Sequence, residues 1–344
     1  GYSGVGKTTL IHELRKLTSR DNPYFITGKY EQHTQEVPLS GLIQALRELT
    51  DTVLSESEDS IRQWREIIFN ALYPNVKLLL DILPQLELIT GHQPEVLELG
   101  TREAQIRFNR YLTKFLTLFA VPQRPLVLFL DDLQWADIAS FQFLKTILTE
   151  GHNSILIVGS YRSNEVSEFH PLMQMLWELE KTGHTFNTIS LEPLSSDDIT
   201  LLLQDTFSVD TEKVADLAAV VKDKTGGNPF FVREFIRNLY YENYIIYNSE
   251  WNWEAENIRQ ANITDNVSEL LTRKFNKIPG EMLHILKTAS CIGDTFTIEL
   301  LQTVTGIEET SLFSILKNSI DEGLIIKSGD SFRFSHDKIQ ETAY

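Results

Sequence analysis

Apolar residues follow two patterns along the chain, and the order of these patterns predicts the fold. Unbroken apolar runs at 126–130 and 155–159 are typical of strands buried on both faces in a parallel sheet. Shorter or weaker runs at 24–28 and 185–194 are interpreted as further strands. Between them lie segments with apolar residues about every 3.6 positions, most clearly at 101–120, which predict amphipathic helices. Strands that alternate with helices indicate an α/β fold with a doubly wound parallel sheet.

The second half of the chain has a different pattern. Residues 191–242 are expected to form a small helical region, whose first helix begins after an N-cap at Ser195 or Ser196. The alternating stretch that follows has a turn at Asn248–Ser249 and is interpreted as a hairpin. From about Ile263 the pattern predicts three helices and then two short strands, an order that suggests a winged helix.

The first eight residues, GYSGVGKT, carry the most specific motif, because they fill the pattern G-x-x-x-x-G-K-[ST] without a mismatch. The glycines let the backbone bend tightly, the loop amides form a nest for an anion, and the next helix adds the positive end of its dipole. Lys7 is expected to reach the β- and γ-phosphates of a nucleotide, and the hydroxyl of Thr8 to ligate Mg²⁺. The predicted nucleotide contacts of this loop are Gly1, Ser3, Gly4, Val5, Gly6, Lys7, Thr8 and Thr9.

A loop of this kind is normally held by a buried strand that precedes it. We therefore expect the sequence to be an excerpt from a longer polypeptide, with the first strand of the sheet upstream of Gly1. The last residues, HDKIQETAY, also stop inside a helical pattern.

Two adjacent carboxylates end the apolar run at 126–130. In open α/β sheets, ligands bind at the carboxyl edge of the strands, so Asp131 and Asp132 are placed where a nucleotide would lie. We expect Asp131 to hold Mg²⁺ opposite Thr8 and Asp132 to orient or deprotonate the attacking water. The alternative for Asp132 is a cap on the following helix. For Asp137, which precedes an apolar helix, capping is the preferred interpretation.

Arg162 follows the second apolar run and is the candidate sensor of the γ-phosphate. A guanidinium at this edge could report the presence of that phosphate or stabilise charge in the transition state. An ordinary surface arginine is the alternative.

These motifs, taken in order, resemble the STAND class of AAA+-related signal-transduction ATPases. GYSGVGKT resembles Walker A, LVLFLDDLQWAD resembles Walker B, and GSYR resembles the sensor arginine. TGGNPFF resembles a lid G-x-P motif and FRFSHD the histidine motif of a winged helix. The resemblance covers essentially the whole chain and is closest to the ATPase segment of large bacterial multidomain serine/threonine and histidine signalling kinases.

The resemblance implies further roles. Gly227 and Pro229 would contact the adenine or ribose side of the nucleotide, and His336 would approach the β-phosphate of ADP. From the residues alone, the glycines and Pro229 only stop one helix and restart the next, and His336 is an ordinary hydrogen-bonded histidine. Walker B ends in Asp-Asp instead of Asp-Glu, which suits slow turnover. No convincing second sensor arginine is found, although Arg233 is a candidate.

Charge and composition narrow the function classes. The chain has 31 basic and 48 acidic residues, a net charge of −17, which opposes long-range attraction to nucleic acid and anionic membranes. No apolar run approaches the length of a membrane span. The single cysteine, Cys291, excludes an internal disulfide, fits a cytoplasmic location and is expected in the core.

The leading hypothesis is a slowly hydrolysing ATPase that switches between a closed ADP form and an open ATP form within a larger kinase-type protein. Kinase and sensor domains outside the chain are the expected partners, with self-association that depends on nucleotide. The alternatives are a DNA-binding AAA+ initiator or transcriptional regulator that uses the winged helix, and a P-loop kinase of a small molecule. Against DNA binding, the candidate recognition helix at 307–322 carries four acidic residues and one lysine.

The expected domains are 1–190 (nucleotide binding), 191–258 (helical lid with hairpin) and 259–344 (winged helix).

Overall fold

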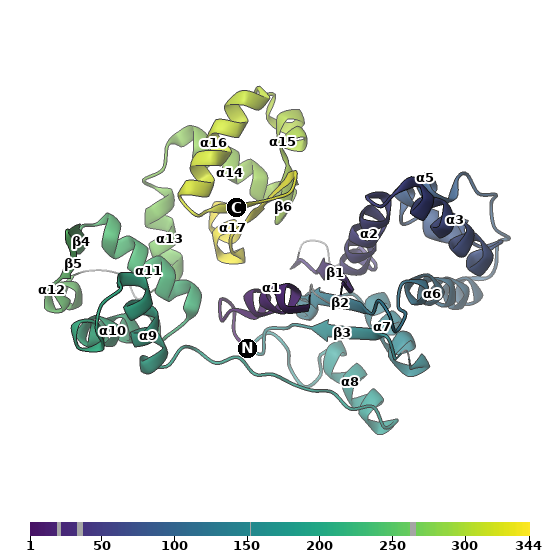
Figure 1. Ribbon diagram of the computed structural model, residues 1–344, viewed down its shortest axis with the longest axis horizontal. Coiled ribbons are helices and arrows are strands. Elements are labelled where there is room, and N and C mark those ends of the chain that lie inside the picture. The colour runs from purple at the N-terminus through teal and green to yellow at the C-terminus, as the bar shows by residue number, and fades with distance from the viewer. Residues whose placement is uncertain (19–21, 33–36, 152, 262–265) are drawn as a thin grey trace. The chain divides into compact units, whose positions relative to one another are not determined.

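The computed structural model describes residues 1–18, 22–32, 37–151, 153–261 and 266–344. The chain divides into two compact units, Gly1–Glu192 and Pro193–Tyr344 (Figure 1). Among the described residues, the first unit has one hydrophobic core and the second has two. The predicted start of a helix near Ile263 falls outside the described residues, and the helix that follows begins at Val267.

A three-stranded parallel sheet organises the first unit. The strands β1 (Tyr24–Lys29), β2 (Leu126–Asp131) and β3 (Ile155–Gly159) lie in the order β1-β2-β3. All six residues of β2 are buried, as expected for a central strand that pairs on both sides. The parallel pairing places the carboxyl ends of all three strands at one edge of the sheet.

Two predicted strands differ from expectation. The run at 155–159 is only partly buried, and Leu156 is 52% exposed, because β3 pairs with β2 alone among the described residues. The run at 185–194 forms no strand and leaves Ile189 exposed. A strand needs hydrogen-bonding partners on a neighbouring strand, and within the described chain this segment has none.

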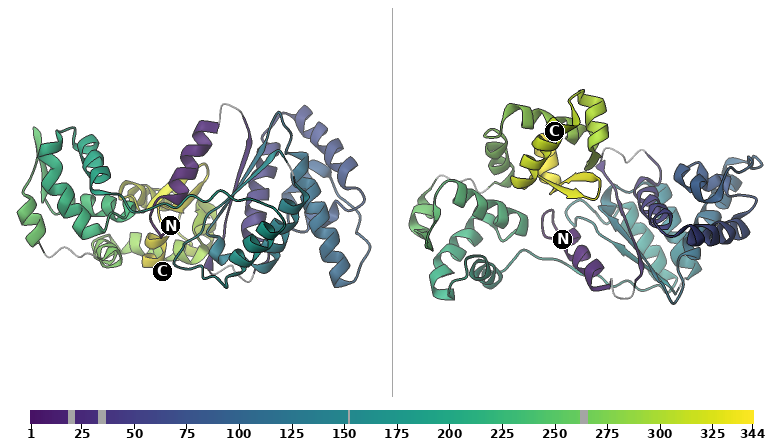
Figure 2. Two further views of the ribbon diagram at one scale, coloured as in Figure 1. Left: turned by 90° about the horizontal axis from the view of Figure 1, so that it is seen from below. Right: turned by 45° about the horizontal axis from the view of Figure 1, so that its top comes forward.

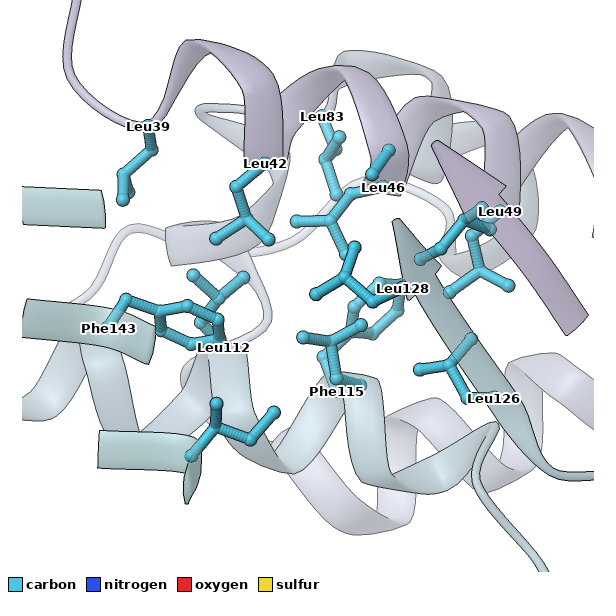
Figure 3. Packing of buried hydrophobic residues seen from close by; sticks show 14 of the residues in the cluster. Leu39, Leu42, Leu46, Leu49, Leu83, Leu112, Phe115, Leu126, Leu128 and Phe143 are labelled. Carbon is cyan, nitrogen blue, oxygen red and sulfur yellow. The ribbon is translucent and has the colours of Figure 1, made fainter. Parts of the chain in front are cut away.

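Helices cover the sheet and extend the first unit. Helix α2 (Ser40–Leu54) packs against β1 and β2, and its Leu42, Leu46 and Leu49 meet Leu126 and Leu128 of β2 in the core (Figure 3). Helix α6 (Thr101–Leu118) contributes Leu112 and Phe115 to the same core, which confirms the helix predicted at 101–120. The remaining helices of this unit are α1 (Lys7–Thr18), α3 (Glu58–Leu72), α4 (Lys77–Leu80), η3 (Pro84–Leu86), α5 (Glu87–Thr90), η4 (Leu133–Trp135), α7 (Ile138–Glu150) and α8 (Pro171–Lys181).

The second unit begins with three helices and a hairpin. Helices α9 (Ser196–Phe207), α10 (Thr211–Thr225) and α11 (Pro229–Tyr241) pack together, green in both views of Figure 2. Ser195 is the N-cap of α9 and forms a capping box with Asp198. The predicted hairpin is present as β4 (Ile245–Asn248) and β5 (Glu250–Trp253), and it is followed by α12 (Ala255–Gln260).

The rest of the second unit combines helices with a small antiparallel sheet. The strands β6 (Thr295–Thr297), β7 (Ile325–Ser328) and β8 (Ser331–Phe334) lie in the order β6-β8-β7. The two predicted strands are present as β7 and β8, but in the described residues four helices and β6 precede them, where three helices were predicted. The helices are α13 (Val267–Phe275), α14 (Gly280–Ile292), α15 (Ile298–Thr305), α16 (Glu309–Asp321) and α17 (Asp337–Ala343).

Cys291 was expected in the core, and this expectation is wrong. It is exposed on α14. The buried face of that helix contains Met282, Ile285 and Ala289, at the spacing of one helical face, and Cys291 lies off that face.

In the described part of the chain, no helix combines the length and apolar character that a bilayer crossing requires.

Candidate functional site

The loop at residues 1–6 leads directly into α1 and has the backbone shape that its glycines allow. Gly4 and Gly6 have φ of 77° and 99°, in the region that side chains with a Cβ rarely adopt. Lys7 begins α1, and its Nζ donates hydrogen bonds to the carbonyl oxygens of Gly1 (3.3 Å) and Tyr2 (2.9 Å). The lysine therefore lies over the loop and not in bulk solvent. Of the other predicted contacts, Val5 is buried, Ser3 is half-buried and Thr9 is exposed.

Thr8 and Asp131, which are far apart in the sequence, are in direct contact. The hydroxyl of Thr8 donates a hydrogen bond of 2.7 Å to Oδ2 of Asp131. Oδ1 of Asp131 accepts from the hydroxyl of Ser160, the residue that follows β3. The carboxylate is only 5% exposed and is held by groups from α1 and from the end of β3. A hydroxyl and a carboxylate are hard oxygen ligands of the kind that Mg²⁺ takes, so this pair fits the ion that the loop implies.

Asp132 lies beside this pair in an unusual conformation. Its φ is 55°, and its side chain makes no capping hydrogen bond to the short helix η4 that follows, so the capping alternative is wrong. Instead, Oδ1 of Asp132 accepts a hydrogen bond of 2.8 Å from Nε2 of Gln134. It also faces Nε of Arg162 at 3.3 Å. Asp132 is thus fixed by two partners at the carboxyl edge of the sheet.

Arg162 is buried and is not an ordinary surface arginine, since its side chain is only 4% exposed. It forms ion pairs with Asp132 and with Glu165, whose Oε1 lies 3.0 Å from NH1. Its guanidinium also lies over the ring of Trp135, at 4.5 Å from the centroid. The backbone N–H of Arg162 donates to Oε1 of Gln134 (3.1 Å), so one glutamine connects the ends of β2 and β3.

Asp137 has the role that the sequence predicted. It is the N-cap of α7, where its Oδ1 accepts from the backbone N–H of Ser140 at 3.0 Å. Its other oxygen accepts from the backbone N–H of Leu39. Asp137 is therefore a structural residue and not part of the candidate site.

In the second unit, the two predicted residues of the G-x-P motif, Gly227 and Pro229, lie where α10 ends and α11 begins. Gly226 is the C-cap of α10, Asn228 is the N-cap of α11, and Pro229 is the first residue of α11. These residues therefore end one helix and begin the next, as the sequence pattern alone predicted. Gly227 does more than end a helix, because its carbonyl accepts a hydrogen bond of 2.8 Å from the backbone N–H of Leu194. A Cβ on Gly227 would lie 2.2 Å from the carbonyl oxygen of Leu194.

His336 lies next to the G-x-P motif, although the sequence separates them by more than one hundred positions. Its ring stacks on the ring of Phe230, with centroids 3.8 Å apart and an angle of 17°. Its Nδ1 accepts from the backbone N–H of Lys338, which makes His336 the N-cap of α17. Arg233 also lies over the Phe230 ring, and its side chain is 54% exposed. The second unit thus brings together Phe230, Arg233 and His336.

A cavity of about 1120 Å³ opens elsewhere in the second unit. Charged residues of both signs line it, among them Glu234, Arg237 and Lys274, and Glu234 is in ionic contact with both cations. None of the predicted site residues lines this cavity.

The sequence analysis did not single out Ser160, Gln134 or Glu165. All three lie within three positions of a predicted site residue, and each bonds to one. Ser160 directly follows β3 and could have been found as a polar side chain at a strand end, whereas Gln134 and Glu165 carry no such signal. The arrangement can hold a divalent cation through Thr8 and Asp131 and can present one buried guanidinium.

Comparison with known proteins agrees with this chemistry. Residues 1–158 match the model of the family described as the AAA ATPase domain.

Two curated relatives that the chain resembles are histidine kinases. The chain is 28% identical over 397 aligned residues to Hybrid signal transduction histidine kinase G of Dictyostelium discoideum, covering 95% of this chain and 11% of that protein. It is 20% identical to Peroxide stress-activated histidine kinase mak3 of Schizosaccharomyces pombe, covering 97% of this chain and 16% of that protein. The chain therefore spans less than a fifth of the length of either relative.

Among solved structures, one match is a Signal Transduction ATPase with Numerous Domains (STAND) protein with a tetratricopeptide repeat sensor from Pyrococcus horikoshii. It is 14% identical, with a TM-score of 0.47, and the match covers all of this chain and 39% of that one.

Proposed function

We propose that this chain binds ATP and ADP with Mg²⁺, hydrolyses ATP slowly, and serves as a nucleotide-controlled switch within a larger signalling kinase. The observation that carries the proposal is the 2.7 Å contact between Thr8 and Asp131. It joins the start of α1, after the glycine-rich loop, to the end of the central strand, which is where a phosphate-bound cation must be shared.

In this proposal, the loop amides and Lys7 bind the phosphates, and Thr8 and Asp131 hold Mg²⁺. The ion, when bound, neutralises charge that develops on the phosphate oxygens. Asp131 is kept in position by Ser160, so that its carboxylate stays aligned when the hydroxyl of Thr8 turns toward the cation.

Asp132 is proposed to position or deprotonate the attacking water, and Arg162 to contact the γ-phosphate. Support comes from their burial and from the network that fixes both at the carboxyl edge of the sheet. Since Asp132 is held by Gln134 and Arg162 at the same oxygen, its geometry is tightly defined, but its carboxylate is engaged before substrate binds. That engagement fits slow turnover.

Residues 191–344 are proposed to consist of a lid (191–258) and a winged helix (259–344), which close on ADP. Gly227, Pro229 and His336 would then contact the nucleotide. Support comes from the stacking of His336 on Phe230, which places the two motifs side by side within the second unit. The switch requires that nucleotide bind the closed and open forms with different affinities.

The context in kinases is inferred from the two histidine kinase relatives. Kinase and sensor domains elsewhere in such a protein would be the partners, a cytoplasmic location is proposed, and self-association would depend on nucleotide. The DNA-binding alternative is not adopted, because α16 presents Glu309 and Asp321 and a single lysine, Lys317.

Nucleotide carried through purification tests the proposal. The complete natural protein would be purified without added nucleotide and denatured, and the released nucleotide identified by chromatography. We expect close to one equivalent of ADP, and a loss of at least about 100-fold in nucleotide affinity for Lys7→Ala, because a phosphate-bound ammonium contributes strongly in a water-poor site. A control variant, Lys145→Ala on the exposed face of α7, should retain nucleotide.

A wild-type protein that binds neither ATP nor ADP would contradict the whole proposal. A protein that binds both and turns ATP over rapidly would retain the site but refute the switch.

A further inference from the structure

Arg162 has two carboxylate partners that differ in how firmly they are held. Asp132 is 5% exposed and is also bonded to Gln134, so it is built into the interior. Glu165 is 30% exposed and lies on the segment after β3, three residues beyond Arg162. A carboxylate at that exposure can be solvated by water once it is released, whereas a buried one cannot.

The segment that carries Arg162 touches the phosphate-binding loop. The backbone N–H of Ser163 donates to the carbonyl oxygen of Gly1 at 3.4 Å. Arg162 therefore belongs to a turn adjacent to the position where the loop would hold the phosphates. An anion entering that position competes with the carboxylates for the same guanidinium.

We propose that Glu165 determines the preference for ATP over ADP by competing with the γ-phosphate for Arg162. This inference rests on the proposed function and deepens it. With ADP, Arg162 keeps both carboxylate partners. With ATP, the guanidinium turns toward the γ-phosphate, and Glu165 is released to solvent while Asp132 stays fixed. Glu165 thus opposes ATP binding and leaves ADP binding unaffected.

The test compares ATP and ADP affinities of the complete natural protein with those of Glu165→Gln, in the presence of Mg²⁺. The substitution keeps the size of the side chain and removes the charge that pairs with Arg162. We expect ATP to bind about 5-fold more tightly and ADP to bind as in the wild type, since a coupling of this size is typical of linked sites. Isothermal titration calorimetry measures both affinities directly.

A matched control separates this effect from a general loss of negative charge. Glu168→Gln removes the same charge three residues further on, at an exposed position. It should leave the ratio of ATP to ADP affinity unchanged.

The outcomes distinguish the inference from the function on which it rests. A ratio raised by Glu165→Gln and not by Glu168→Gln supports the inference. The inference is overturned if the wild type binds both nucleotides and Glu165→Gln leaves the ratio of ATP to ADP affinity unchanged, or if both variants shift this ratio equally. The proposed ATPase then remains intact. If the wild type binds neither nucleotide, both fail. Unchanged circular dichroism spectra and melting temperatures show that each variant is folded.

Discussion

The candidate residues of the first unit are bonded to one another, whereas those of the second unit are bonded to nearby backbone. Thr8 contacts Asp131, and Asp132 contacts Arg162, so groups from three segments form one network. In the second unit, Pro229 starts a helix and His336 caps one. The first unit therefore has a preassembled network of candidate residues, whereas helix ends position the two motifs of the second unit.

This difference has consequences for substitutions. A change in the network of the first unit should alter chemistry with little effect on the fold, provided that the shape is kept. A change in the second unit should alter stability first, because each motif residue also ends or begins a helix.

The largest effect is expected for Asp132→Asn. Asparagine keeps an oxygen acceptor for Gln134 and the same size, and Arg162 keeps Glu165 as an ionic partner. Binding of ATP should change by less than about 3-fold, while hydrolysis should fall about 100-fold, as is typical when a general base is lost. A steady-state phosphate-release assay and a binding titration measure the two quantities separately.

Asp51→Asn, on the exposed surface of α2, is the matched control and should hydrolyse ATP at the wild-type rate. Full turnover by Asp132→Asn would remove Asp132 from the proposed mechanism.

In the second unit, two adjacent glycines provide a matched pair. Both have positive φ, 62° for Gly226 and 80° for Gly227, but a Cβ on Gly226 would meet nothing within 4 Å. Gly226→Ala should cost about 1 kcal/mol, the usual penalty for a left-handed alanine. Gly227→Ala should cost about 3 kcal/mol, because its Cβ would also push the backbone of Leu194 away.

Chemical denaturation of the second unit, followed by the fluorescence of Trp251 and Trp253, measures this difference. Equal losses for the two variants would show that the approach of Gly227 to Leu194 contributes nothing to stability.

The fold could be predicted from the sequence where one segment determines its own structure. The helix at 101–120, the capped start at Ser195 and the hairpin near Asn248–Ser249 depend on local spacing and turn residues, and all are present. The run at 185–194 was predicted as a strand on the same grounds and is not one, since a strand depends on a partner elsewhere in the chain.

The site shows the same limit. The glycine-rich loop, Asp131 and Arg162 could be found because a motif or a strand end marks them. Gln134 and Glu165 could not, since their importance lies in contacts with Asp132 and Arg162 that only the folded sheet creates. The meeting of Phe230 with His336 is also a product of the fold, because no local pattern links the two.

The smallest effect is expected for Tyr24, a buried residue of β1 that takes no part in the candidate site. Burial raises the pKa of its phenol from 10.0 to about 12, with Arg124 opposing the shift and Glu56 adding to it. Because the folded state holds this proton more tightly than the unfolded state, the stabilisation is complete below pH 10 and is lost as the pH rises through 12.

Between pH 10 and pH 12, the first unit should therefore lose up to about 2 kcal/mol more stability in the wild type than in Tyr24→Phe. The variant lacks the ionising hydroxyl of Tyr24 but keeps the other lysines and tyrosines that titrate in this range. Their contributions to the free energy of unfolding therefore cancel when the wild type and the variant are compared. In the second unit, burial lowers the pKa of Lys274, so its folded state favours the neutral amine and its contribution to stability rises with pH only up to about pH 10.5, the ordinary pKa of lysine. Urea denaturation between pH 10 and pH 12 measures the trend of Tyr24. Parallel curves for wild type and Tyr24→Phe would show that Tyr24 ionises in the folded protein as it does in the unfolded chain.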